Sequence, residues 1–113
     1  MNNGYPDGIG VEVFTFESLE EIWRHEKSDE RREHIALNYY DYTKDEKAFG
    51  SKFSVGTIKC PVQYSRPNII LDVNDLKDYK FIKKLYDDLY PINNKFGIEE
   101  IIEWYDKNKK RIG

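Results

Sequence analysis

The chain has 113 residues, of which 39% are apolar and 35% are charged, and its formal net charge is -3. This length suits one domain, and 15% aromatic residues provide enough apolar surface to exclude a fully disordered chain. The 18 Lys and Arg residues are interleaved with 21 Asp and Glu residues, so the clustered positive charge that binds a phosphate backbone is missing. No nucleic-acid partner is expected.

The cysteine content and the hydropathy of the sequence indicate the cellular compartment of the protein. Cys60 is the single cysteine, and we interpret it as a small packed residue rather than a nucleophile. No apolar run approaches the roughly 20 residues that span a bilayer. The polar residues 1–4 lack the pattern of a signal peptide. We therefore expect a soluble, cytoplasmic protein without a membrane partner.

The first half of the chain predicts a turn, a strand and two helices. Residues 5–8 read Tyr-Pro-Asp-Gly, a turn, and the alternation in residues 11–16 predicts a strand that is partly covered on both faces. A short helix should follow, capped by Thr15 or Ser18. Its apolar face consists of Leu19, Ile22 and Trp23. The charge-rich residues 28–47 predict a second helix.

The second half predicts two strands and two helices. The strands are expected within residues 53–60 and 69–73, the latter buried at the centre of a sheet. A helix capped by Asp75, with Asp78 in its first turn, should end before Pro91. A last helix follows Gly97. Its buried stripe is expected to be Ile98, Ile101, Ile102 and Tyr105, with Lys107, Lys109, Lys110 and Arg111 at its C-terminal end. This order predicts a mixed α/β fold.

Three groups of residues offer chemistry, and each also has a structural explanation. Asp7 and Glu12 flank a glycine-containing turn and could bind sugar hydroxyls, or the segment is only a tight turn into a strand. The run at residues 30–34 would place a Glu and a His on one helix face for proton transfer and offers two Arg side chains for anions, or it is a solvated face.

The third group lies at the end of the second predicted strand of this half. Asp72, Asn74 and Asp75 supply oxygen donors of the kind that Mg2+ prefers. Helix capping explains Asp75 without a metal, whereas a buried Asp72 needs a partner. Both interpretations remain open from the residues alone.

Several segments together resemble one known family. Residues 5–19 resemble the pattern YPDGLDVEVFSFEAL, residues 32–35 resemble REHV, and residues 66–86 resemble RPDIRLTLDTPEDYELIKKIY. These patterns occur in this order in the spore coat polysaccharide biosynthesis protein F-like cytidylyltransferases. That family includes the enzymes that make CMP-activated acidic sugars.

The resemblance implies a nucleotide-diphospho-sugar transferase fold, with a mixed sheet flanked by helices. It implies transfer of CMP from CTP to an acidic or other sugar, with release of pyrophosphate, in an Mg2+-dependent homodimer. The family's CTP-binding glycine and arginine-rich loop has no counterpart among these 113 residues, so the chain resembles the C-terminal half, one structural unit over residues 1–113. Such a fragment is expected to be inactive and to contribute no catalytic residue.

The resemblance also implies roles for individual residues. The sugar side of the cleft would be formed by Asp7, Glu12, Arg32, Glu33 and His34, with the helix around Arg32 close to the dimer contact. The ungapped alignment, which we prefer because it also makes Asp75 the helix cap, places the family's metal-binding aspartate on Asn74, whereas a shift of two residues would place it on Asp72. A neutral amide at the metal position would weaken Mg2+ binding. The alternative hypothesis is a non-catalytic sugar-recognition or dimerisation module.

Overall fold

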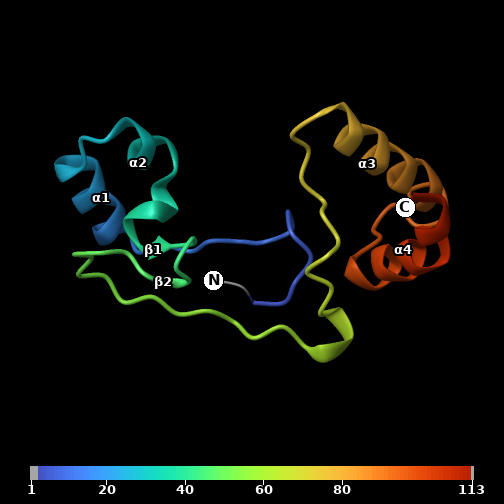
Figure 1. The fold of residues 1–113 in the computed structure, drawn as a ribbon, viewed down its shortest axis with the longest axis horizontal. Coiled ribbons are helices and arrows are strands. Elements are labelled where there is room, and N and C mark those ends of the chain that lie inside the picture. The colour runs from blue at the N-terminus through green and yellow to red at the C-terminus, as the bar shows by residue number, and fades with distance from the viewer. Residues whose placement is uncertain (1–2, 113) are drawn as a thin grey trace. The chain divides into compact units, whose positions relative to one another are not determined.

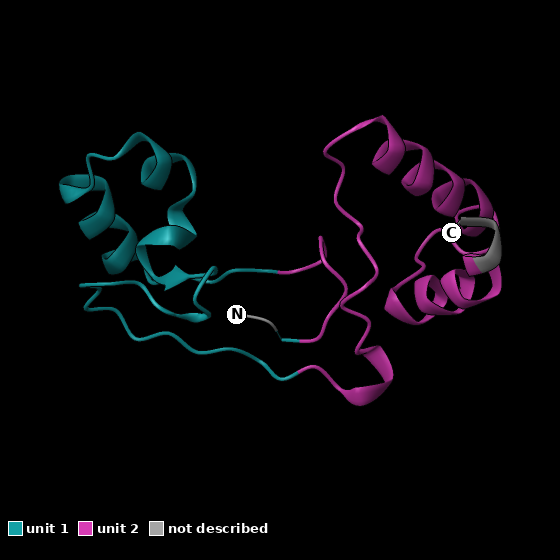
Figure 2. Cartoon of the chain, in the orientation of Figure 1, with its two compact units in different colours: residues 1–3, 11–59 teal, residues 4–10, 60–113 magenta. Residues whose placement is uncertain are grey.

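A computed structural model describes residues 3–112 of the chain, with side chains up to residue 109. In chain order its elements are α1 (Phe16–His25), α2 (Asp29–Glu33), β1 (Tyr40–Asp41), β2 (Glu46–Lys47), α3 (Leu76–Leu89) and α4 (Ile98–Ile112) (Figure 1). Two 3-10 helices, η1 (Ile35–Asn38) and η2 (Val62–Tyr64), complete the described part. The chain divides into unit 1, residues 1–3 and 11–59, and unit 2, residues 4–10 and 60–113 (Figure 2).

Unit 1 is organised around α1 and the ring of Tyr39. The hydroxyl of Thr15 accepts a hydrogen bond from the Ser18 amide at 3.2 Å, so Thr15, one of the two predicted candidates, is the N-cap. Tyr39 is buried, and its ring lies 4.8 Å from the ring of Phe14 and 4.9 Å from that of Phe53. These aromatic contacts join three segments that are distant in sequence into one small core.

The helix predicted over residues 28–47 is wrong beyond Glu33. Ser28 caps a five-residue helix, α2, through the Arg31 amide. Farther on, the carboxylate of Asp41 accepts hydrogen bonds from the amides of Thr43 and Lys44 at 2.9 and 3.2 Å. This local bonding competes with a helix and closes the antiparallel hairpin of β1 and β2.

The strands predicted over residues 11–16 and 53–60 are also wrong. Neither segment pairs with another strand in the described part of the chain, and α1 already begins at Phe16. Val11 and Val13 are 84% and 89% exposed, whereas Phe14 packs on Tyr39, so the segment is covered on one side at most. Alternating apolar residues favour an extended backbone, but a strand also requires a neighbouring chain to pair with.

The strand predicted over residues 69–73 is reduced to one bridge. Ile69 is fully buried, as expected of a central position, and Ile70 pairs in parallel with Asp7. The pairing does not extend into a ladder. The contact nevertheless brings the turn at residues 5–8 against residues 69–72 within unit 2.

Helices α3 and α4 form the main apolar contact of unit 2. Leu85 of α3 and Ile102 and Trp104 of α4 are buried. The Trp104 indole N–H donates to the Asp88 carboxylate at 2.9 Å, which satisfies a polar group that packing removes from water. The predicted stripe of α4 is at least half-buried throughout, whereas Trp104 was not anticipated. The side chains of Lys110 and Arg111 lie outside the described residues.

The start of α3 follows the prediction. The Asp75 carboxylate accepts a hydrogen bond from the Asp78 amide at 2.9 Å, and Asp78 in turn accepts one from the Asn74 amide at 3.0 Å. Two backbone donors at the beginning of the helix are thereby satisfied. The helix ends at Leu89, two residues before Pro91, as predicted.

Substitution of the α3 cap tests this assignment. We expect Asp75→Ala to lower the free energy of unfolding by about 1 kcal/mol, because the Asp78 amide loses its acceptor. Chemical denaturation followed by circular dichroism measures the change. Asp75→Asn keeps an acceptor at the same place and should lose markedly less stability. Equal losses in the two variants would contradict a capping role.

Candidate functional site

The candidate site is built where the N-terminal turn meets residues 69–72 in unit 2. The Asp7 amide donates to the carbonyl of Ile69 at 2.9 Å, and the Leu71 amide donates to the carbonyl of Asp7 at 2.8 Å. These bonds fix the backbone of Asp7 beside the segment that leads into Asp72. Two of the predicted site residues are thus brought into one region by backbone pairing.

Gly8 makes this approach possible. Its φ of +93° lies in the left-handed region, which residues with a side chain rarely adopt. A Cβ at this position would lie 2.4 Å from the Asp72 nitrogen and 2.7 Å from the Leu71 carbonyl carbon. Such distances exclude any side chain. Gly8 of the predicted turn therefore serves the close packing of one backbone on another.

The backbone of Asp72 takes part in this contact, and its side chain has one oxygen that differs from the other polar atoms of the region. Its Oδ2 accepts a hydrogen bond from the Asn74 side-chain amide at 2.9 Å. Its Oδ1 is buried and has no hydrogen-bond partner among the described residues. A buried carboxylate oxygen without a donor is costly, so this atom is a candidate ligand for a cation or a donor group.

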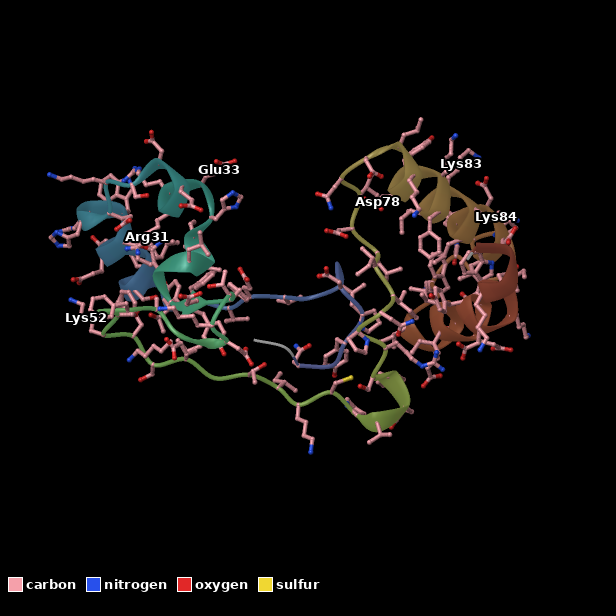
Figure 3. The ribbon with its side chains drawn as sticks, in the orientation of Figure 1. Arg31, Glu33, Lys52, Asp78, Lys83 and Lys84 are labelled. Atoms are coloured by element: carbon pink, nitrogen blue, oxygen red, sulfur yellow. The ribbon has the colours of Figure 1, made fainter. Side chains whose placement is uncertain are left out.

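The neighbouring carboxylates are already engaged. Asp75 and Asp78 hold the start of α3, where Asp78 is labelled in Figure 3. The side-chain amide of Asn74 donates a hydrogen bond to Asp72. Position 74 therefore carries a neutral amide and no charged ligand. Within the described residues, no group of three or more His, Cys, Asp or Glu side chains is arranged to hold a metal ion.

The remaining predicted sugar-side residues lie in unit 1. Glu12 accepts a hydrogen bond from the Tyr42 hydroxyl at 3.1 Å, and burial together with the Glu12 charge raises the pKa of Tyr42. Arg32 donates to the carbonyls of Glu26 and Trp23 at 2.9 and 3.3 Å. Arg32 therefore satisfies acceptors at the C-terminal end of α1, a structural use of its guanidinium.

Arg32 also lines an apolar recess of about 410 Å³ in unit 1. The other lining residues are Phe16, Leu19, Glu20, Ile22, Trp23 and Ile35. Glu33 and His34 are exposed, with Glu33 Oε1 3.8 Å from His34 Nε2. The predicted helical face of Glu30 and His34 is not formed, because α2 ends at Glu33. The His34 amide still donates to the Glu30 carbonyl at 2.8 Å.

The ion pair between Arg66 and Asp106 was not anticipated from the sequence. Its two hydrogen bonds are both 2.6 Å long and join residues that are 40 positions apart. Asp106 also lines a second recess, of about 540 Å³, beside Tyr64 and Glu99. No local sequence pattern indicates an ion pair between residues that are so far apart in the chain.

Cys60 is buried, and burial raises the pKa of its thiol, in line with a packed residue.

Comparison with known proteins finds a distant relative. The chain is 32% identical over 101 residues to the uncharacterized protein MJ1063 of Methanocaldococcus jannaschii. The match covers 89% of this chain and 38% of that protein, so the chain spans well under half the length of this relative. No family model matches the chain, and no solved structure matches it. Among the described residues, no helix has the length and apolar character needed to cross a membrane.

The ion pair in unit 2 predicts a dependence of stability on pH. Hydrogen bonds from the Arg66 guanidinium hold the pKa of Asp106 below its usual range. An unfolded aspartate has a pKa of about 3.9, so the pair stabilises the fold above that pH. Its contribution is lost as the pH falls through the lower folded pKa.

We expect Asp106→Asn to melt at a lower temperature than the wild type at pH 7. The two melting temperatures should converge as the pH falls below about 4. Thermal denaturation across this range measures the difference. Glu103→Gln is the matched control on the same helix, because it breaks the exposed Lys107 pair and should shift melting much less. A difference that persists unchanged at low pH would exclude this mechanism.

Proposed function

We propose that this chain supplies the sugar-side wall of a cytidylyltransferase that transfers CMP from CTP to a sugar in surface or spore coat polysaccharide biosynthesis. The ordered motifs at residues 5–19, 32–35 and 66–86 support the proposal. The mixed sheet of the proposed fold would then be completed by polypeptide beyond the matched region. The greater length of the relative is compatible with such a larger assembly.

The buried Oδ1 of Asp72 is the observation that carries the proposal. A carboxylate whose second oxygen is held by Asn74 presents its first oxygen without a donor. Mg2+ in nucleotide sites is commonly bound through one or two carboxylates together with substrate phosphates. Asp72 fits that requirement, whereas Asn74, which turns its N–H toward Asp72, fits it poorly.

In this proposal the residues of the chain have divided tasks. Asp72 would hold Mg2+, and Asn74 would position Asp72 through its amide hydrogen bond. When bound, Mg2+ would neutralise phosphate charge during attack by a sugar hydroxyl. Asp7, in the same unit as Asp72, offers a side chain for sugar hydroxyls, and within unit 1 the exposed Glu33 and His34 offer theirs. Arg32 and Glu12 contribute through the structure of unit 1, since both already have intramolecular partners.

The second candidate is a non-catalytic sugar-recognition or dimerisation module. It is favoured by the structural engagement of Glu12, Arg32, Asp75 and Asp78. If these groups serve only the fold, the chain would have no need of a metal. Metal binding therefore distinguishes the two candidates.

Binding of Mn2+, a paramagnetic probe for Mg2+, tests the role of Asp72. We expect weak binding to the wild type, roughly millimolar, with line broadening centred on residues 71–74. Asp72→Asn should weaken binding about tenfold or more, because the charged ligand is lost. Nuclear magnetic resonance titration of the labelled chain measures both effects. Unchanged Mn2+ binding in Asp72→Asn would exclude Asp72 as the ligand.

The same titration separates the two possible metal positions. Asn74→Asp should tighten Mn2+ binding about tenfold if position 74 is the family's metal site, because it adds a charged ligand. Asn94→Asp adds the same charge in the exposed loop after α3 and is the matched control. If Asn74→Asp changes affinity no more than Asn94→Asp, position 74 is excluded as the metal position, and the Asp72→Asn titration decides on Asp72.

Calorimetry with CTP and Mg2+ tests whether the chain needs the rest of an enzyme. The 113 residues contain no counterpart of the family's CTP-binding loop, so we expect no CTP binding in the micromolar range. ATP serves as the control nucleotide. Micromolar binding of CTP to the chain alone would contradict the proposed division of the site.

A further inference from the structure

Helix α3 has two apolar faces: one packs on α4, and the other is covered only in part, where the ring of Tyr86 lies 5.9 Å from that of Phe96. The inner face packs on α4 through Leu85, which is 3% exposed, and through the ring of Phe81, whose centroid lies 5.7 Å from that of Trp104. The outer face carries four large side chains that are between 44% and 66% exposed, namely Leu76, Tyr79, Tyr86 and Tyr90. A helix at the surface of a monomer normally presents a polar outer face.

The outer stripe has the spacing of a helix-pairing seam. Leu76, Lys83 and Tyr90 are separated by seven residues each, and Tyr79 and Tyr86 occupy the intermediate positions at i+3. This is the a and d pattern of a heptad. Lys83 points away from α4 and forms an ion pair with Asp87 on the same helix (Figure 3). The rings of Tyr86 and Tyr90 stack at 4.8 Å, which gives the seam a preformed aromatic surface.

The charges beside this seam are ordered along the helix. Lys77, Lys80, Lys83 and Lys84 precede Asp87 and Asp88. Lys80 and Asp87 both occupy the position that follows d, which is e in the heptad. In an antiparallel pair of identical helices, e positions of the two helices face each other, so each Lys80 would meet an Asp87. In a parallel pair this complementarity is lost.

We propose that the outer face of α3 pairs antiparallel with α3 of a second copy of this chain. One register satisfies the aromatic and charged positions together. It places Tyr79 beside the partner's Tyr90 and Lys83 over the ring of the partner's Tyr86, an arrangement suited to a cation–π contact. The same register sets Lys80 against the partner's Asp87. The contact is isologous, so each interaction occurs twice.

This surface is separate from the dimer contact that the family resemblance implies near Arg32. Arg32 lies in unit 1, whereas the α3 seam lies in unit 2. The proposal therefore does not depend on the proposed enzymatic function. Association through the Arg32 helix, or through contacts made by further polypeptide, would not respond to the charges of the α3 seam.

Charge reversal on α3 tests the pairing. Lys80→Glu would set a carboxylate against the partner's Asp87, and Asp87→Lys would set two ammonium groups together. We expect each variant to weaken dimerisation roughly tenfold or more, as two attractive contacts become repulsive. Analytical ultracentrifugation of the 113-residue chain at low salt measures the dissociation constant. Lys77→Glu makes the same charge change outside the seam and should dimerise like the wild type.

Mixing the two variants separates a lost contact from a damaged fold. A dimer of one Lys80→Glu chain and one Asp87→Lys chain restores opposite charges at both contacts. We expect the mixture to dimerise about tenfold more tightly than either variant alone, and high salt should reduce this difference, since exposed charge pairs are screened. A monomeric wild type, a dimer insensitive to both reversals, or a mixture no tighter than its components would each overturn the proposal.

Discussion

The backbone of Gly8 rests directly on the backbone of Leu71 and Asp72, and the arrangement of the candidate site depends on this contact. The approach is possible only without a Cβ, since one would lie 2.4 Å from the Asp72 nitrogen. The paired hydrogen bonds of Asp7 hold the turn in place. Asp72, whose backbone lies against Gly8, has one carboxylate oxygen buried and unpartnered among the described residues. The close packing of two backbones and the buried, unpartnered carboxylate oxygen therefore meet at one residue, Asp72.

Helix ends impose a second constraint on the charged residues. Asp75 and Asp78 satisfy amide donors at the start of α3, and Arg32 satisfies carbonyl acceptors at the end of α1. Backbone groups at helix termini have no partners within the helix, so side chains must supply them. Charged residues that resemble binding groups in the sequence are therefore partly committed to the fold. Asp72 differs from them because its buried oxygen has no such task.

Exposed apolar surface is the third theme of the structure. Val11, Val13 and Ile58 lie on extended segments without strand partners among the described residues, and Tyr79 and Tyr90 lie on the outer face of α3. Apolar surface of this kind is commonly covered by another chain or by further polypeptide. The two kinds of surface differ in what they offer. Extended segments offer unpaired backbone groups, whereas α3 offers a regular seam with self-complementary charge.

Local signals in the sequence were enough to predict the starts of α1 and α3 and the end of α3, but not the short extent of α2. Thr15 and Asp75 mark helix starts, and Pro91 limits the end of α3, because caps and helix-breaking residues act within one turn. Contacts between distant segments decide which extended segments pair. Of the three predicted strands, two have no strand partner among the described residues and the third forms a single bridge. Long-range folding also produced the Arg66 contact with Asp106 and the close approach of Gly8 to Asp72. Strand pairing and long-range contacts depend on residues far apart in sequence, which periodicity along one segment does not encode.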